Sequence, residues 1–272
     1  MLKKIKAQFL VNESQDIIIS DINTASDLPI NVYIHGYGSF YLKTSEQDFK
    51  NRINQISGYE HILVRWPSEH YNKAIIEGLT KGLALNQLRN LKSTTSKLSQ
   101  ISGPLLVIGI EALTQIKKVQ NKTHHLDTVF AERLNQFMLM HKKANRPINF
   151  VAHSFGTRLL LNALMNKNNR SLFNALNLHN IVLMGGAIDR DAVSWQDVLG
   201  QIRGNIYNCY SKKDWALAVK PDFDKNIGRY PVVLKDEYAG RIINQEMKDI
   251  DHKSYWRKLD DVLARLDLTN ER

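Results

Sequence analysis

Hydrophobic and polar positions along the chain form two alternating patterns. Short apolar runs rich in Val, Ile and aromatic residues are typical of buried strands, whereas apolar residues three and four positions apart are typical of helices. Because the two patterns alternate, we expect an α/β protein with a mostly parallel central sheet flanked by helices. The predicted strands are 6–11, 15–20, 30–34, 61–66, 147–152, 181–184 and 205–210, and the predicted helices outside one long insertion are 46–56, 126–140, 157–165 and 254–266.

The segment between the strands at 61–66 and 147–152 is too long for a single crossover helix. Helical spacing at 74–91 and 108–119 precedes the helix that leads into the next strand. We therefore expect residues 1–272 to form a single domain with a helical insertion, or cap, at about 71–120. Its apolar residues are typical of a lid over an acyl-binding pocket, and equally of helices buried in the core.

The chain is basic, with 37 Lys+Arg against 27 Asp+Glu and a net charge of +10. The basic residues are scattered, without interleaved aromatic residues or a nucleic-acid-binding motif, so we expect no nucleic-acid partner. Peripheral contact with an anionic membrane remains an alternative, since each basic side chain near such a surface contributes about 1 kcal/mol to binding. The sequence does not indicate an oligomeric state.

Composition also limits the kind of site and the cell compartment. A single cysteine, Cys209, excludes a disulfide framework and a multi-cysteine metal site. His124 and His125 lack the spacing of metal ligands, so we expect neither a metal nor a cofactor. Polar residues follow the basic N-terminus too early for a signal peptide, and the longest uncharged run, 98–110, is shorter than the roughly 20 residues of a membrane span. We expect a cytoplasmic protein, with signal-independent export as the alternative.

Residues 150–158, Phe-Val-Ala-His-Ser-Phe-Gly-Thr-Arg, join a predicted strand to a predicted helix. A serine on a sharp strand-to-helix turn with small residues on either side is typical of a nucleophile elbow. Gly156 supplies one small residue and Ala152 the other, so Ser154 is the candidate nucleophile and His153 is expected to support the turn. The alternative is that Ser154 is an ordinary N-cap of the helix.

A serine nucleophile also needs N–H groups that stabilise an oxyanion. Residues 35–38, His-Gly-Tyr-Gly, follow the strand at 30–34 directly. We expect the backbone N–H groups of Tyr37 and Phe155 to form the oxyanion hole. The alternative for this segment is a plain glycine turn.

These motifs, followed by an Asp and then a His, resemble the α/β-hydrolase superfamily over about residues 28–268. The chain looks closest to a lipase-like branch with membrane-tethered eukaryotic and soluble bacterial members. That branch is similar in its helical insertion, in the Arg-Pro pair at 146–147 and in residues 208–215, Asn-Cys-Tyr-Ser-Lys-Lys-Asp-Trp. The chain departs from the pattern at Ala152 and at 185–187, Gly-Gly-Ala, where Gly-Ala-Pro is more usual. The resemblance implies an α/β-hydrolase fold with a triad in the chain order Ser, Asp or Glu, His.

The other two triad positions, the base and the acid, have two candidate histidines and three candidate aspartates. His179 precedes a strand on the side away from the active end, so His252, just before the last predicted helix, is the candidate base. Asp214 follows the strand at 205–210, at the strand end where sites form in open α/β sheets, and the resemblance favours it as the acid. Asp189 and Asp191 follow the preceding strand and remain alternatives.

Together these residues predict a serine hydrolase that cleaves carboxylic esters through an acyl-enzyme, with Ser154 as nucleophile, His252 as base and Asp214 orienting the imidazole. An apolar insertion on a basic chain favours a lipid or other ester substrate, as in a lipase or phospholipase. The sequence indicates neither the acyl chain, nor the head group, nor the substrate-binding residues. The alternatives are a non-enzymatic interaction protein with a hydrolase fold and a toxin-type lipase effector delivered into other cells.

Overall fold

The computed structural model describes residues 17–25, 27–37, 43–68, 114, 116–218, 225–234 and 238–268. These residues form a seven-stranded sheet in the order β1-β3-β2-β4-β5-β6-β7. β1 is antiparallel to β3 and each of the other neighbouring pairs is parallel, which confirms the expected mostly parallel sheet. The strands are β1 (Ile18–Asp21), β2 (Ile30–Ile34), β3 (Glu60–Arg65), β4 (Ile148–His153), β5 (Leu178–Met184), β6 (Ile206–Tyr210) and β7 (Ile242–Glu246).

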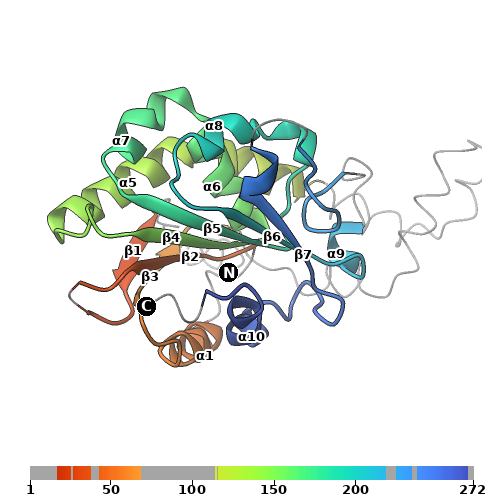
Figure 1. Ribbon diagram of the computed structural model, residues 1–272, viewed down its shortest axis with the longest axis horizontal. Helices are drawn as coiled ribbons and strands as arrows, with labels where there is room; N and C mark the ends of the chain where they lie inside the picture. The colour runs from red at the N-terminus through yellow and green to blue at the C-terminus, as the bar shows by residue number, and fades with distance from the viewer. Residues whose placement is uncertain are drawn as a thin grey trace, which may run out of the picture.

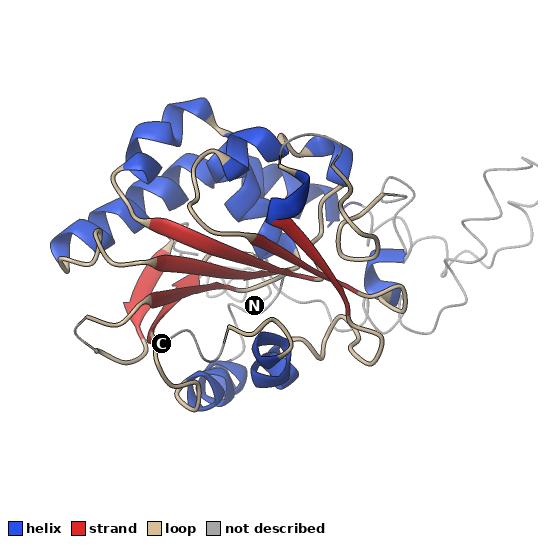
Figure 2. Ribbon diagram, viewed as in Figure 1, coloured by secondary structure: helices blue, strands red, loops and turns tan. Residues whose placement is uncertain are grey.

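Helices cover both faces of this sheet (Figures 1 and 2). One face carries α5 (Asp127–Met140), α6 (Phe155–Met165), α7 (Arg170–Asn174) and α8 (Trp195–Leu199), and the other carries α1 (Lys43–Ile53) and α10 (Leu259–Ala264). The short α9 (Trp215–Ala218) follows β6. Because both faces are covered, the central strands are mostly apolar, and all six residues of β4 are buried. Short 3₁₀ helices are η3 (Lys167–Asn169), η4 (Arg190–Ala192), η6 (Ala239–Arg241) and η7 (Trp256–Lys258).

The strand order reverses direction between β2 and β4. From β2 the chain adds β3 on one side, and it then returns to add β4 on the other side. In open α/β sheets, ligands bind outside the C-terminal ends of the strands at such a switch point. The loop after β2 and the turn after β4 both lie at this point.

The predicted elements agree with the structure best for the central strands. β2 has the predicted bounds, β5 begins three residues earlier than predicted, and α1 is shifted toward the N-terminus. The single helix predicted at 254–266 is divided into η7 and α10, and β7, α7 and α8 were not predicted. The predicted strand at 6–11 and helix at 74–91, and with them most of the insertion, lie outside the described residues, whereas residues 116–125 are helical and extend beyond the predicted end at 119.

Two further findings concern the chemistry of the chain. Cys209 is fully buried in β6, and burial raises the pKa of its thiol. Across the part of the chain that the structure describes, none of the helices has the length and apolar character that crossing a membrane requires.

Candidate active site

The turn after β4 holds Ser154 in a backbone conformation that L-residues rarely adopt, with φ +55° and ψ −121°. Such a conformation costs on the order of 1–3 kcal/mol and persists only where surrounding contacts hold it. The Ser154 N–H donates to the Met184 carbonyl (3.1 Å), and the Ser154 carbonyl accepts from the N–H groups of Thr157 (3.2 Å) and Ala187 (3.0 Å). The Ser154 side chain makes no capping hydrogen bond to α6, so the residue has the geometry of a nucleophile elbow rather than of an ordinary N-cap.

Two glycines let the elbow pack against the loop after β2. A Cβ atom on Gly156 would lie 2.4 Å from the carbonyl oxygen of His35 and 2.6 Å from that of Ile34, and backbone atoms cannot move aside as a flexible side chain can. A Cβ atom on Gly36 would lie 2.9 Å from the Cβ atom of Ser154. The start of α6 and the end of β2 can therefore meet this closely only because glycine occupies both positions.

His252 lies in the loop between β7 and η7 and reaches the elbow from the far end of the chain. Its Nε2 atom lies 2.9 Å from Ser154 Oγ, and its Nδ1 atom lies 2.7 Å from Asp214 Oδ2. A carboxylate only accepts hydrogen bonds, so the proton belongs on Nδ1 and the lone pair of Nε2 faces the serine hydroxyl. The structure thus brings together Ser154, His252 and Asp214 in one hydrogen-bonded series.

Asp214 follows β6 and is completely buried. Its Oδ1 atom accepts the backbone N–H of Leu217 at 3.1 Å, which leaves Oδ2 for the imidazole of His252. A Cβ atom on Gly185 would lie 3.3 Å from Asp214 Oδ2 and 3.4 Å from His252 Nδ1, and Gly185 has φ +51°. The contact between the carboxylate and the imidazole therefore lies directly over this glycine. Sequence reasoning missed this role of Gly185, although the Gly-Gly pair after a strand was the signal for it.

The other two candidate acids have different partners. Asp189 caps η4, where its Oδ1 atom accepts the backbone N–H of Asp191 at 2.8 Å. The carboxylate of Asp191 is exposed and pairs with Lys225 and Arg190. The structure therefore brings Asp214, and neither of these two residues, to the imidazole of His252.

His153 connects the elbow to the loop that carries His252. Its Nε2–H donates to the backbone carbonyl of His252 (2.9 Å), and the two imidazole rings pack with their centroids 4.8 Å apart. Burial, followed by the nearby rings of His252 and His35, holds the pKa of His153 well below its usual range. The ring therefore stays neutral, and it positions the loop rather than carrying a charge.

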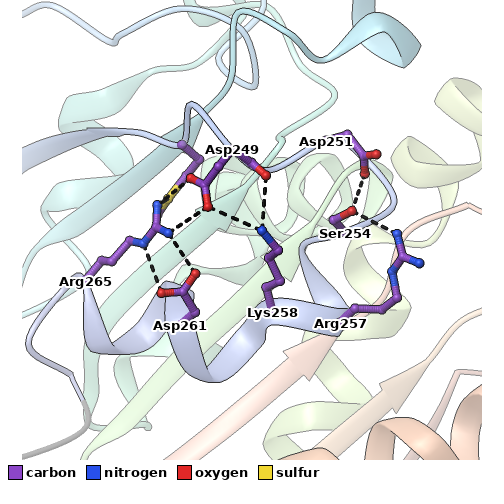
Figure 3. A network of polar contacts seen from close by, with 8 residues as sticks. Asp249, Asp251, Ser254, Arg257, Lys258, Asp261 and Arg265 are labelled. Carbon is purple, nitrogen blue, oxygen red and sulfur yellow. Dashed lines mark hydrogen bonds and ion pairs between the residues drawn. The ribbon is translucent and has the colours of Figure 1, made fainter.

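An exposed network of ion pairs connects the loop before His252 to the last helix (Figure 3). Arg265 donates to both carboxylate oxygens of Asp249 (2.8 and 2.9 Å), and Lys258 donates to the same carboxylate at 3.3 Å. Asp251, directly before His252, accepts the hydroxyl of Ser254, two residues after His252, at 2.6 Å. Bidentate arginine–carboxylate contacts fix geometry as well as charge, so this network restrains the loop relative to α10.

The two candidate oxyanion donors lie on the segments that meet beside Ser154. The rings of Tyr37 and Phe155 contact each other edge to face, with centroids 6.5 Å apart. Phe155 is the first residue of α6, where backbone N–H groups have no acceptor within the helix. The N-terminal end of this 11-residue helix also contributes positive potential, which favours a developing negative charge.

A buried carboxylate, an imidazole and a serine hydroxyl joined in this order can generate a nucleophile at neutral pH. The sheet order, the elbow after β4 and the arrival of the three side chains in the order Ser, Asp, His are those of the α/β-hydrolase fold, as the resemblance implied.

Solved structures of similar shape include a predicted CIB-like hydrolase from Thermoplasma acidophilum (TM-score 0.46, 12% identity, covering 93% of this chain and 90% of that chain). They also include the mature lipase BlEst2 from Bacillus licheniformis (TM-score 0.48, 11% identity, covering 92% of this chain and 97% of that chain). A third is the carboxylesterase CesB (YbfK) from Bacillus subtilis (TM-score 0.42, 10% identity, covering 92% of this chain and 86% of that chain). At these scores the likeness is one of general shape. A family model described as "Protein of unknown function (DUF726)" matches residues 13–267, so the chain belongs to the DUF726 family.

Proposed function

We propose that the protein is a serine hydrolase that cleaves carboxylic esters through an acyl-enzyme. The observation that carries this proposal is the series of two hydrogen bonds, 2.9 Å from Ser154 Oγ to His252 Nε2 and 2.7 Å from His252 Nδ1 to Asp214 Oδ2. Strain at Ser154 supports it, because strained backbone at a buried polar residue is typical of a functional site.

In the proposed reaction, Ser154 Oγ attacks the ester carbonyl while its proton passes to Nε2 of His252. Asp214 holds the imidazole in the required tautomer and stabilises the imidazolium without taking the proton. The N–H groups of Tyr37 and Phe155 stabilise the oxyanion of the tetrahedral intermediate. The alcohol then leaves with the proton from His252, and a water molecule activated by the same imidazole releases the acid from Ser154.

Three variants test the assignment on 4-nitrophenyl butyrate. We expect Ser154→Ala to abolish turnover, and Asp214→Asn to lower kcat by about 10³-fold or more, since the amide favours the wrong tautomer of His252. Asp189→Asn is the matched control and should change kcat by less than about threefold, because Asp189 caps η4 instead. Turnover retained in Ser154→Ala, or a larger loss in Asp189→Asn than in Asp214→Asn, would contradict the proposal. A folded wild-type protein without turnover would favour a non-enzymatic interaction protein.

We further propose a lipase-like substrate preference with peripheral contact to anionic membranes. The net charge of +10 and the apolar insertion at about 71–120 support it. Anionic vesicles should raise the rate on a long-chain ester and leave that on 4-nitrophenyl butyrate unchanged. The gain should fall between about 0.1 M and 1 M salt, where the screening length falls from about 10 Å to about 3 Å. Equal rates with anionic and neutral vesicles would contradict this preference.

A further inference from the structure

Arg158 is a half-buried cation near the elbow that has no counter-ion among the residues that the structure describes. Within the described part of the chain, no hydrogen bond or ion pair engages its guanidinium, and its Nε atom is buried without a partner. The two terminal nitrogens are not among the buried unpartnered atoms, so they reach solvent. Burial lowers the pKa of Arg158 from its usual value, which means that the site disfavours the charge it carries.

Two other shielded arginines of the described chain, Arg146 and Arg241, each have several acceptors, whereas Arg65 and Arg229 share with Arg158 a buried Nε atom without a partner. Arg146 donates to the Leu28 carbonyl and to the carboxylate of Glu60. Arg241 donates to backbone carbonyls that include those of Leu199 and Ile202. A partly buried charge without such partners destabilises the folded state, and the solvent-accessible terminal nitrogens leave donors available for an anionic ligand.

The position of Arg158 on α6 puts it close to the candidate nucleophile. It follows Phe155 by three residues, so these two share one side of α6, and it follows Ser154, the residue before the helix, by four. Four residues correspond to about 6 Å along the helix axis, and helical side chains lean toward the N-terminus. This lean directs the long side chain of Arg158 toward the first turn of α6. Further along the same side of α6, Asn162 donates to Thr123 Oγ1 at 3.3 Å, so residues 116–125 lie against this side.

We propose that Arg158 binds an anionic group, a carboxylate or a phosphate, carried by the ester substrate. The terminal guanidinium nitrogens offer the planar donor pair that suits both groups, and Arg158 follows the candidate oxyanion donor Phe155 by one helical turn. The inference rests on the proposed esterase function and narrows its substrate class to acidic esters.

Two pairs of substrates that differ mainly in charge test this inference and distinguish the two anions. The carboxylate pair is mono-4-nitrophenyl glutarate against 4-nitrophenyl pentanoate, and the phosphate pair is dioctanoyl phosphatidic acid against dioctanoylglycerol in neutral detergent micelles. For at least one pair we expect Arg158→Gln to lower the ratio of kcat/KM, anionic over neutral, by about 10-fold or more. Arg158→Lys should lower this ratio less than Arg158→Gln does, since lysine keeps the positive charge but lacks the planar pair of guanidinium donors. Arg170→Gln, which removes an exposed arginine paired with Asp197, is the control and should leave both ratios unchanged.

Binding measured without turnover separates this inference from the esterase proposal. In the Ser154→Ala background, calorimetry should detect octyl phosphate or octanoate binding that weakens about 10-fold or more when Arg158 is also changed to Gln. Unchanged ratios in the kinetic test together with unchanged binding would overturn the inference and leave the esterase proposal standing. A wild-type protein that binds these anions through Arg158 and hydrolyses none of the four esters would overturn the esterase proposal alone. Equal losses on both members of each pair would identify Arg158 as a structural residue and overturn the inference.

Discussion

At the scale of single residues, strain and burial coincide at Ser154. Four non-glycine residues of the described chain have positive φ, and of these only Ser154 is buried, whereas Asp27, Lys142 and Asp267 are exposed. The motif around residue 154 predicted the elbow from local spacing alone. The hydrogen bonds that hold the strained backbone come from Met184 and Ala187, on a neighbouring strand and the loop after it, and no local pattern indicates them.

His153 makes a second residue-scale property measurable. Below about pH 6.5 an unfolded chain protonates this histidine, whereas the folded state, with its lowered pKa, does not. The unfolded state then binds more protons than the folded state. As the pH decreases, the free energy of unfolding therefore decreases by up to about 1.4 kcal/mol per pH unit, until the pKa of the folded state is reached. His153→Gln retains an N–H donor for the His252 carbonyl and removes the titration.

We expect urea titrations between about pH 7 and pH 5 to show a smaller loss of stability in His153→Gln than in the wild type. His61, another described histidine whose pKa is lowered, is present in both proteins, so its titration contributes equally to both. Parallel losses in the two proteins would show that His153 does not titrate in this way.

At the scale of elements, the contact between α6 and the end of β2 depends on Gly156. We expect Gly156→Ala to destabilise the protein by about 1–3 kcal/mol, since the new methyl group meets two backbone carbonyls at 2.4 and 2.6 Å. Gly240→Ala is the matched control, because a Cβ atom there meets nothing within 4 Å. Denaturation of both variants measures the difference. A Gly156→Ala protein as stable as the control would mean that the two elements are not in close contact.

The elements that the sequence predicted are those with a clear local pattern. β2 and β4 are mostly apolar and buried throughout because both faces of the sheet are covered, so their runs are easily recognised. β7 was missed because it is an edge strand of mixed character, in which Ile243 is exposed and polar residues follow. The last predicted helix begins as η7 and continues as α10, a division that its continuous apolar spacing does not reveal.

At the scale of the whole molecule, the candidate site joins segments that follow the C-terminal ends of β4, β6 and β7. Sequence order and strand ends led to Ser154, His252 and Asp214. The choice among Asp214, Asp189 and Asp191 depends on which strand end lies beside the His252 loop, which is a property of the sheet order. Arg158 is part of the elbow motif, but the absence of a counter-ion among the described residues became apparent only from the packing around it.

The most direct test of this account is covalent labelling with a fluorophosphonate probe, followed by peptide mapping. Such probes react with a serine only where a base and oxyanion donors activate it. We predict that the wild-type protein carries the label on Ser154 and that Ser154→Ala carries none. Asp214→Asn should react much more slowly, whereas Asp189→Asn should react at the wild-type rate. Label on another residue, or a folded wild-type protein that does not react, would contradict the central claim that Ser154, His252 and Asp214 form a working catalytic triad.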